Sequence, residues 1–495
     1  MSSIHTDNKE TPVLVGFGVA TQREDDFAQS LEAIDLMIQA TRRAGAATGS
    51  DAVLAGVQQI AVPRGRWSYR NPAGAIGRAI GAREPRTVLT TPGVLQQSLI
   101  GDACRRIAQG EIDTALVVGG DTGYRIQRAQ AAGVPMGERE DNDEPQLTIK
   151  PHDELRHPAE LRAGLQMPVG LYAMAESAFR ARHGWSVETH RDRMARLYSR
   201  FTEIAAGNPH AWKREQLAPD LIRDASPRIP MHAFPYTRLH SSNWSVDQAS
   251  ALLFCSQSKA LALGIPRERW IYPLASTESN HMVPVSARAE LGACPGAGIA
   301  GRAALAGANL TPQALDLVNL YSCFPIAVEV YAEELGLAPD RDLTVTGGMA
   351  FAGGPYNNYV LQATCRMAEL LSAGAGRTGL VSTVSGIITK QAFGIWSRAP
   401  GVAPFAWADL TDSVAQQVRT KPVLESYEGP GVVAGYTVLS DRSAPAKGIV
   451  IADIDGGRRT LGVSHDPALV AALQTREFCG TPVRIAADGT FQTSH

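Results

Sequence analysis

Apolar residues in the first 120 positions follow two spacings. Short continuous apolar runs predict buried strands at residues 13–16, 57–62, 86–90 and 115–118. Apolar side chains three and four positions apart predict amphipathic helices at residues 30–44, 72–80 and 95–108. Ser30 is the expected N-cap of the first helix. Strands that alternate with helices indicate an α/β sheet with helices on its faces.

The stretch from residue 343 to 390 repeats this alternation around two polar loops. A β-rich run at 343–346 leads into the glycine cluster 347–355, and a helical pattern follows. A strand at 379–384 then ends in the loop 385–390. Glycine at the carboxyl end of a strand lets the backbone approach a ligand closely. We therefore expect a site where these two loops open on one side of the sheet.

The order strand, turn, helix and strand also occurs at residues 86–120, which predicts an internally duplicated α/β fold. Further strands are predicted at 249–255 and 316–320, and further helices at 299–307 and 326–335. Between the two copies, residues 124–243 are rich in Arg, Glu, His and Pro. We expect this segment to form helices and loops laid over the sheet rather than sheet strands.

The pattern changes after the Pro/Gly-rich connector at 399–404, which marks a domain boundary. Period-two runs predict strands at 431–439, 448–453, 458–463 and 482–485, with one helix at 466–473. About 85 residues of short strands with a helix suit a small closed β-barrel, which we expect to be OB-like.

Composition narrows the class of protein. The chain has 495 residues, too many for one ordinary core, and its 44% hydrophobic and 19% charged content suits a globular protein. A formal net charge of −2 gives no attraction to nucleic acid or an anionic membrane, and no apolar run reaches the length of a bilayer span. The six cysteines are scattered without a C-x-x-C pair, so we expect a reduced cytoplasmic protein without a metal site.

Three motifs carry a resemblance to a known family. Asn319-Leu320-Tyr321-Ser322-Cys323-Phe324 stands where thiolases have N-E-A-F or H-D-C-F, Gly353-Gly354-Pro355 where they have G-H-P, and Val384-Ser385-Gly386 where they have C-x-G. Over roughly residues 10–398 the chain resembles the thiolase superfamily, and within it the sterol-carrier-protein-thiolase-like proteins of type 1, which carry an extra C-terminal domain.

The resemblance implies a duplicated thiolase fold with five layers in the order αβαβα, a helical and loop insert, and the additional small β-barrel. The implied units are the N-terminal half (1–123 and 244–272), the insert (124–243), the C-terminal half (273–398) and the additional domain (410–495).

The chemistry of the family matches less well. A thiolase divides its work among an acyl-carrying thiolate, a histidine base and a proton-shuttling thiol. The matched positions here hold Pro92 or Gly93, then Gly354, then Val384. The resemblance implies a nominal acyltransferase, yet we expect neither ordinary thiolysis nor Claisen condensation.

Five polar side chains on the matched loops are candidate catalytic groups: Tyr321, Cys323, Asn357, Ser385 and Lys390. Tyr321 falls where the family holds its oxyanion-hole water, and would donate a hydrogen bond to a thioester carbonyl; the alternative is a phenol satisfied by neighbouring backbone. Cys323 matches a structural cysteine, so buried packing is its expected role. Lys390 reads either as a solvated surface charge or as the partner of an anionic group or carbonyl.

Five residues are candidates for binding CoA: Gly353, Gly354, Asn358, Gly386 and Arg182. Asn357 and Asn358 stand at a predicted helix start, where they would favour an oxyanion or cap the helix. Arg182 belongs to an Arg-rich stretch, 180–200, which we read as one helix whose arginines mostly face solvent. His232 lacks metal-ligand spacing and is read as structural.

Three hypotheses follow. The first is a protein that handles a bulky or hydrophobic acyl-CoA without an acyl-cysteine, by acyl transfer or by a retro-aldol reaction assisted by Tyr321. The second is a non-catalytic acyl-CoA-binding or scaffold protein whose C-terminal domain recruits a protein partner. The third makes Cys323 a relocated nucleophile. In each case we expect CoA or its thioester as substrate or ligand, no tightly bound cofactor, and a monomer or homodimer.

Overall fold

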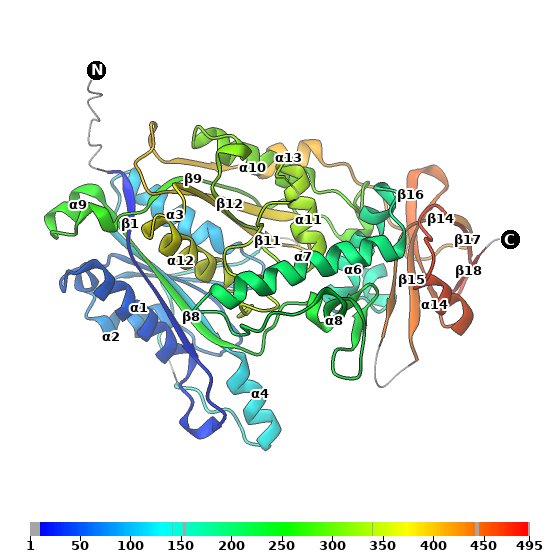
Figure 1. Ribbon diagram of the computed structural model, residues 1–495, viewed down its shortest axis with the longest axis horizontal. Coiled ribbons are helices and arrows are strands. Elements are labelled where there is room, and N and C mark those ends of the chain that lie inside the picture. Colours follow the sequence, from blue (N-terminus) through cyan, green and yellow to red (C-terminus); the bar gives the residue numbers. More distant parts are fainter. Residues whose placement is uncertain (1–9, 141, 152–154, 339, 441–444, 494–495) are drawn as a thin grey trace.

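A computed structural model of the chain describes residues 10–140, 142–151, 155–338, 340–440 and 445–493. The strands of these residues form three sheets, and helices cover the faces of the first two (Figure 1). The outer limits of the predicted units, at residues 1 and 495, lie outside the described residues. None of the described helices is long and apolar enough to cross a bilayer.

The first sheet contains six strands. In spatial order they are β1 (Pro12–Gln22), β8 (Asp247–Ser256), β4 (Thr114–Thr122), β2 (Gln59–Pro63), β3 (Arg86–Thr90) and β5 (Leu147–Ile149). β8 is buried along its whole length because neighbouring strands and helices cover it on all sides. Residues 91–95 lead from the carboxyl end of β3 into α3 (Gln96–Ala108).

The second sheet contains five strands. In spatial order they are β10 (Leu317–Asn319), β11 (Thr378–Ser385), β12 (Lys390–Ser397), β9 (Tyr272–Ser279) and β13 (Ala406–Asp409). The pairings β9–β12–β11–β10 run antiparallel, antiparallel and parallel, the same succession as β1–β8–β4–β2 in the first sheet. This repeated topology agrees with the predicted duplication.

Helices separate and cover the two sheets. α3 (Gln96–Ala108) and α12 (Tyr359–Ser372) contact both sheets and lie between them. The outer face of the first sheet is covered by α1 (Ala33–Thr48) and α2 (Pro72–Ile80), and the outer face of the second by α10 (Pro295–Gly307), on which α11 (Pro325–Glu334) packs. The chain therefore has a mixed α/β fold in which a layer of helices separates two sheets.

The described residues among 124–243 form five α-helices, three short strands and the loops between them. Their helices are α4 (Gly123–Ala132), α5 (Pro158–Arg162), α6 (Pro168–Arg182), α7 (Val187–Gly207) and α8 (Pro219–Arg223). The expectation of no sheet strands is wrong, because β5 extends the first sheet, and β6 (Met231–Ala233) and β7 (Tyr236–Thr237) join the third. The prediction of one Arg-rich helix over residues 180–200 is also wrong. Two helices share this stretch, because Gly184 adopts a left-handed conformation after α6 and Ser186 caps α7.

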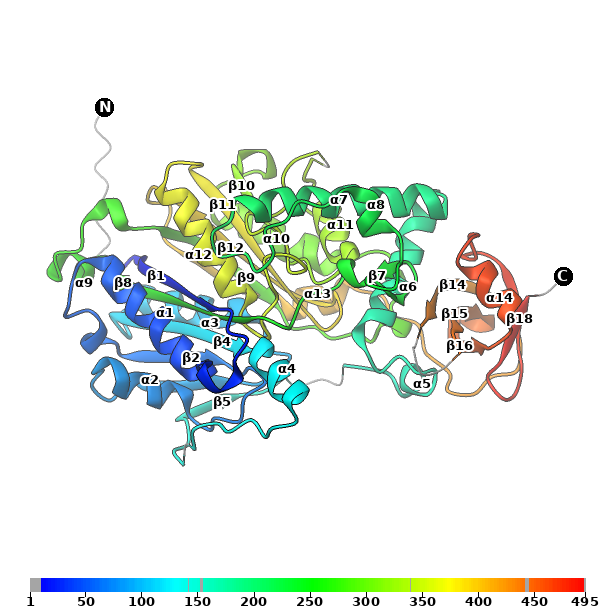
Figure 2. The same cartoon turned by 60° about the horizontal axis from the view of Figure 1, so that its bottom comes forward.

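The third sheet forms the C-terminal unit, at one end of the molecule (Figure 2). Its strands are β16 (Arg458–Ser464), β15 (Lys447–Ile454), β14 (Gly429–Leu439), β17 (Pro482–Ile485) and β18 (Phe491–Thr493). The closed OB-like barrel is not confirmed. Closure would require β16 to pair with β18, and among the described residues these two ends of the sheet are joined by one isolated bridge, Val463–Thr490. The remaining helices are α9 (Gln257–Ala262), α13 (Thr411–Gln417) and α14 (Pro467–Leu473).

Two local predictions fail for identifiable reasons. The run 343–346 is not a strand, because the Asn319 side chain takes the place of a strand partner: its Oδ1 accepts from Val345 N at 3.1 Å and from Thr344 Oγ1 at 3.0 Å. Ser30 does not cap α1, since its hydroxyl donates to Phe27 O and closes a short 3-10 turn, and the helix begins at Ala33.

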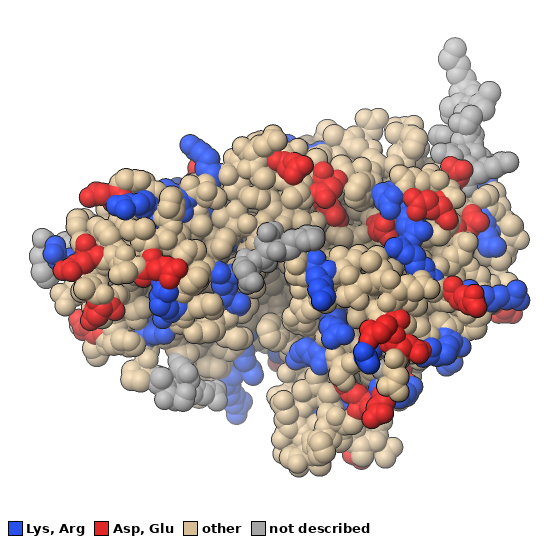
Figure 3. Space-filling model, turned by 180° about the vertical axis from the view of Figure 1, so that it is seen from behind, with Lys and Arg blue, Asp and Glu red and all other residues tan. Residues whose placement is uncertain are grey.

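The surface carries mixed charge. On the face shown in Figure 3, lysine and arginine side chains are interspersed with aspartate and glutamate, as the formal net charge of −2 leads one to expect.

Candidate functional site

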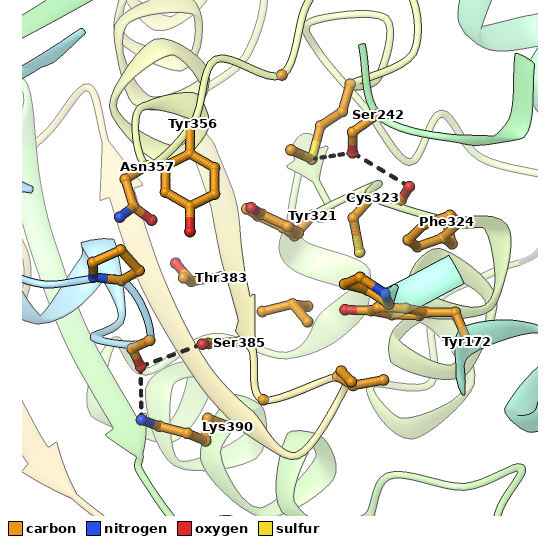
Figure 4. A pocket seen from close by; sticks show the side chains of 18 of the residues that line it. Tyr172, Ser242, Tyr321, Cys323, Phe324, Tyr356, Asn357, Thr383, Ser385 and Lys390 are labelled. Atoms are coloured by element: carbon orange, nitrogen blue, oxygen red, sulfur yellow. Dashed lines mark hydrogen bonds between the residues drawn. The ribbon is translucent and has the colours of Figure 1, made fainter. Parts of the chain in front are cut away.

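One cavity of about 530 Å³ gathers the motif loops of both halves (Figure 4). It is lined by residues after β3, by the loop between β10 and α11, by the glycine loop before α12, by the loop between β11 and β12, and by the start of α6. Parallel strands end at the same sheet edge, so β10 and β11 bring their loops together although paired residues such as Val318 and Leu380 are 62 positions apart.

The positions matched to the thiolase catalytic groups all line this cavity: Pro92, Gly93, Gly354 and Val384. Gly93 has φ +99°, and a Cβ atom there would lie 3.0 Å from Pro151 Cγ. The Gly93 carbonyl accepts from Lys390 Nζ at 2.7 Å and from Ser385 Oγ at 3.3 Å. The loop is therefore held in a conformation that suits glycine, and a side chain there would press against Pro151.

This geometry predicts the cost of restoring a cysteine. Gly93→Cys is expected to lower the free energy of unfolding by about 1–3 kcal/mol, because the new side chain meets Pro151 and the backbone conformation disfavours it. Gly133→Cys is the matched control, since Gly133 also has a left-handed φ, of +66°, but nothing lies within 4 Å of its Cβ position. Urea denaturation of both variants measures the difference; equal losses would contradict the packing argument.

Three hydroxyl groups face the same part of the cavity, on Tyr321, Tyr356 and Thr383 (Figure 4). Thr383 is 1% exposed, and its Oγ1 has no hydrogen-bond partner among the described residues. Burial raises the pKa of Tyr321, so its phenol stays protonated and remains a hydrogen-bond donor. Its ring packs edge-on against Tyr359 with centroids 5.5 Å apart. The ring is thus fixed by packing while its hydroxyl points into the cavity.

Cys323 lies beside this cluster with a weakly acidic thiol. Burial raises the pKa of Cys323 to about 12, although contact with the Tyr172 hydroxyl opposes this shift. A thiol with this pKa has roughly one thiolate per 10⁵ molecules at pH 7, and the thiolate is the nucleophile. The structure therefore favours packing over reaction for Cys323.

The same pKa predicts the outcome of a labelling experiment. Incubation with a mass-tagged acyl-CoA or with iodoacetamide near neutral pH is expected to leave Cys323 unmodified, because its thiol is buried and protonated. Labelling in urea is the comparison, since unfolding exposes the Cys323 thiol and returns its pKa to the ordinary range. Peptide mass spectrometry after digestion gives the readout, and rapid acylation of Cys323 would revive it as a nucleophile.

The loop between β11 and β12 has an unusual backbone. Gly386, Ile387 and Ile388 all have positive φ, of 59°, 55° and 64°. A left-handed conformation costs a β-branched residue about 1–2 kcal/mol. Arg288 Nη2 holds the loop by donating to Gly386 O at 3.1 Å, and burial lowers the pKa of that guanidinium. Strain kept by such contacts is typical of functional loops.

Lys390 is buried rather than solvated, at 6% exposure, so the surface-charge alternative is wrong. It begins β12, and its ammonium lies against the loop that follows β3. Ser385 contacts the same carbonyl. Lys390 and Ser385 thus hold the Gly93 loop in place as part of the cavity wall.

The two asparagines take different places. Asn357 lines the cavity with φ +52°, and its Nδ2 donates to Arg64 O at 2.7 Å, so it is not a cap. Asn358 precedes α12 but makes no side-chain cap hydrogen bond; it is buried, and its Nδ2 lies 3.4 Å from Ser250 Oγ. Asn357 is brought to the site and Asn358 is not among its lining residues.

Of the candidates for binding CoA, Gly354 and Gly386 line the cavity, whereas Gly353 and Arg182 do not. Gly353 faces the Gln248 side chain. Arg182 donates to Glu333 Oε1 at 2.6 Å and to Gly292 O at 3.0 Å. Its guanidinium is therefore engaged with protein groups away from the cavity.

Sequence reasoning missed several lining residues: Tyr172, Trp244, Met282, Tyr356 and Thr383. Tyr356 directly follows the Gly353-Gly354-Pro355 motif and Thr383 directly precedes Val384, so adjacency to the motifs was an available signal. Tyr172 comes from the insert, where no motif marks it. His232 lines the cavity although its sequence context read as structural.

Comparisons with known proteins agree with this architecture. The family model of the thiolase-like protein type 1 additional C-terminal domain matches residues 409–490. A monomeric SCP2-thiolase-like protein type 1 from Mycobacterium smegmatis is 27% identical, with a TM-score of 0.82 over 98% of this chain and 99% of that one.

Two further proteins are similar to this chain over a shorter stretch or in fold alone. An acetyl-CoA acetyltransferase from Methanocaldococcus jannaschii is 28% identical over 174 residues, which span 34% of this chain and 40% of that relative. Human mitochondrial 3-ketoacyl-CoA thiolase in complex with CoA has a TM-score of 0.56 and 16% identity over 79% of this chain and 99% of that one, a likeness of fold alone.

The two-sheet fold and the motif loops around one cavity are similar to those of the thiolase superfamily. Residues 409–490 match the additional C-terminal domain of thiolase-like proteins of type 1, and the whole chain resembles one solved protein of that type.

Proposed function

We propose that this cavity binds the acyl group of a CoA thioester and that the protein handles the thioester without an acyl-cysteine. The observation that carries the proposal is the Tyr321 hydroxyl, which points into a cavity formed by the thiolase motif loops while Pro92, Gly93, Gly354 and Val384 stand at the matched catalytic positions. In the absence of a thiolate and a histidine at these positions, ordinary thiolysis and Claisen condensation are not expected.

The lining indicates a bulky apolar acyl group. Met167, Met282, Met349, Phe324 and Trp244 contribute apolar surface, and methionine adapts its shape to irregular ligands. A volume of about 530 Å³ falls within the range of small-molecule sites. Polar groups occupy one part of the wall, so the acyl chain would lie along the methionines with its thioester carbonyl towards the hydroxyls.

The chemistry that remains is polarisation of the carbonyl. A neutral phenol that donates to the thioester oxygen stabilises negative charge that develops there, in a site that excludes water. Acyl transfer to a bound acceptor and retro-aldol cleavage both develop such charge. Non-catalytic acyl-CoA binding is the second candidate, and the protonated, buried thiol of Cys323 favours it, because no activated nucleophile is present in the cavity among the described residues.

The pairing of β3 in the first sheet supports a monomer. β5, which comes from the chain's own insert, pairs in parallel with β3 and covers that edge of the first sheet. Because β3 is paired with β2 on one side and with β5 on the other, it has no free edge to pair with a second copy. The relative from Mycobacterium smegmatis is described as monomeric, and we extend that state to this chain.

Calorimetric titration tests the binding claim. CoA carrying a long or branched acyl group is expected to bind with micromolar affinity and more tightly than CoA alone. Val384→Phe, which adds a ring to the cavity wall, is expected to weaken acyl-CoA binding at least tenfold. Val402→Phe is the matched control, since Val402 is 79% exposed on the connector. Absence of binding at millimolar acyl-CoA would overturn the proposed function.

A further inference from the structure

Three side chains that lie far apart in the sequence converge behind the cavity wall. Glu176 on α6, His190 on α7 and Glu329 on α11 each offer one ligand-type atom, and these atoms all lie within 4.8 Å of one another. His190 Nε2 is 2.6 Å from Glu176 Oε1, and the Glu176 and His190 side chains are 0% and 1% exposed. The spacing of these residues gave no metal signal, because each comes from a different helix.

The carboxylates of this cluster lack a dedicated cation. Glu329 Oε2 is buried without a hydrogen-bond partner among the described residues. Arg180, the nearest arginine on α6, is engaged by Glu477 Oε2 at 2.8 Å and by the Tyr436 hydroxyl at 2.7 Å. Arg193 stacks on the Trp185 ring, 3.9 Å from its centroid. Two buried carboxylates therefore need a proton or a metal ion to offset their charge.

We propose that Glu176, His190 and Glu329 bind one divalent transition-metal ion, with Zn²⁺ as the best-fitting probe. Two carboxylates and one imidazole are ligands that Zn²⁺ accepts at about 2.0–2.2 Å. Metal binding replaces the hydrogen bond between Glu176 Oε1 and His190 Nε2. It lengthens the distance between these two atoms by roughly 1 Å, as two ligands of a tetrahedral ion require. The Tyr236 hydroxyl donates to Glu176 Oε2 at 2.5 Å and orients this ligand from outside the coordination shell.

The position of the ion gives it a structural role. α6 supplies Tyr172 to the cavity, and α11 begins directly after Phe324, which also lines it. An ion held by α6, α7 and α11 would link the insert to the second half and fix this part of the cavity wall. The inference does not depend on what the cavity binds.

Metal analysis of the full-length chain tests the site. Protein purified without a histidine tag is stripped with a chelator and dialysed against Zn²⁺, Mn²⁺ or Ni²⁺. We expect about one equivalent of Zn²⁺ per chain by plasma mass spectrometry, and a rise of several degrees in the thermal unfolding midpoint on adding Zn²⁺ to the stripped wild-type protein.

Variants separate this site from adventitious binding. Glu329→Gln and His190→Gln are expected to lose the bound Zn²⁺ and the thermal shift. Glu333→Gln, on the same helix α11 but engaged with Arg182 and His183, is expected to keep both. No bound metal and no thermal shift in the wild-type protein would show that the carboxylates share a proton instead. Equal Zn²⁺ binding by wild type and Glu329→Gln would also overturn the proposal.

Discussion

Replacement of Tyr321 by phenylalanine is expected to lower the turnover of a CoA thioester by about 10²–10³-fold, the usual cost of removing one oxyanion donor. The phenylalanine ring keeps the edge-on contact with Tyr359, so the fold and the affinity for acyl-CoA should change little. The measurement is kcat for acyl transfer and for retro-aldol cleavage over a panel of bulky acyl-CoA substrates.

Tyr427→Phe provides the control for this prediction. The Tyr427 hydroxyl donates to Pro430 O at 2.8 Å in the C-terminal domain, and Tyr427 does not line the cavity. Its removal should leave turnover unchanged. Turnover that survives in Tyr321→Phe would show that the phenol has no catalytic role. Absence of turnover in the wild-type protein would favour the non-catalytic acyl-CoA-binding protein.

Replacement of Arg459 by methionine is expected to lower the stability of the C-terminal domain by about 3–5 kcal/mol. Arg459 is 2% exposed; it donates to the backbone oxygen of Arg288, to Ala289 O at 2.9 Å and to Asp453 Oδ1 at 2.7 Å. Methionine fills similar volume but removes the charged donor from the backbone oxygens of Arg288 and Ala289, whereas Asp453 still accepts from Lys421 Nζ at 2.8 Å. Differential scanning calorimetry should show a lower unfolding midpoint.

The effect should reach the cavity, because Arg288 itself donates to Gly386 O in the strained loop. Arg458→Met is the matched control: this neighbour makes one hydrogen bond, to Asp455 O at 3.0 Å, within its own turn. If Arg459→Met unfolds within about 0.5 kcal/mol of Arg458→Met, the C-terminal domain does not depend on this connection.

Elements whose ends carry local signals were predictable from the sequence. α2 matches its predicted range, 72–80, because Asn71 caps it, Pro72 fills its first position and Gly81 ends it in a left-handed conformation. The run 343–346 failed, because the Asn319 side chain, from a distant segment, satisfies its backbone. Closure of the C-terminal sheet into a barrel is not confirmed, and alternation along a strand does not specify which edges pair.

In the site, too, the residues marked by local motifs were predictable and those placed by distant contacts were not. The motifs located the loops at Tyr321, Gly354 and Ser385, and the sheet topology brings all three to one cavity. Lys390 could not be placed, because its burial arises from contact with Gly93, 297 residues away along the chain. The cluster of Glu176, His190 and Glu329 was likewise invisible, since helix packing alone assembles it.

A crystal structure of the protein with a bulky acyl-CoA bound tests the central claim most directly. We expect the acyl group among the methionines of the cavity, the thioester intact, and its carbonyl oxygen within hydrogen-bond distance of the Tyr321 hydroxyl. An acyl group covalently attached to the protein, or one bound outside this cavity, would contradict the account.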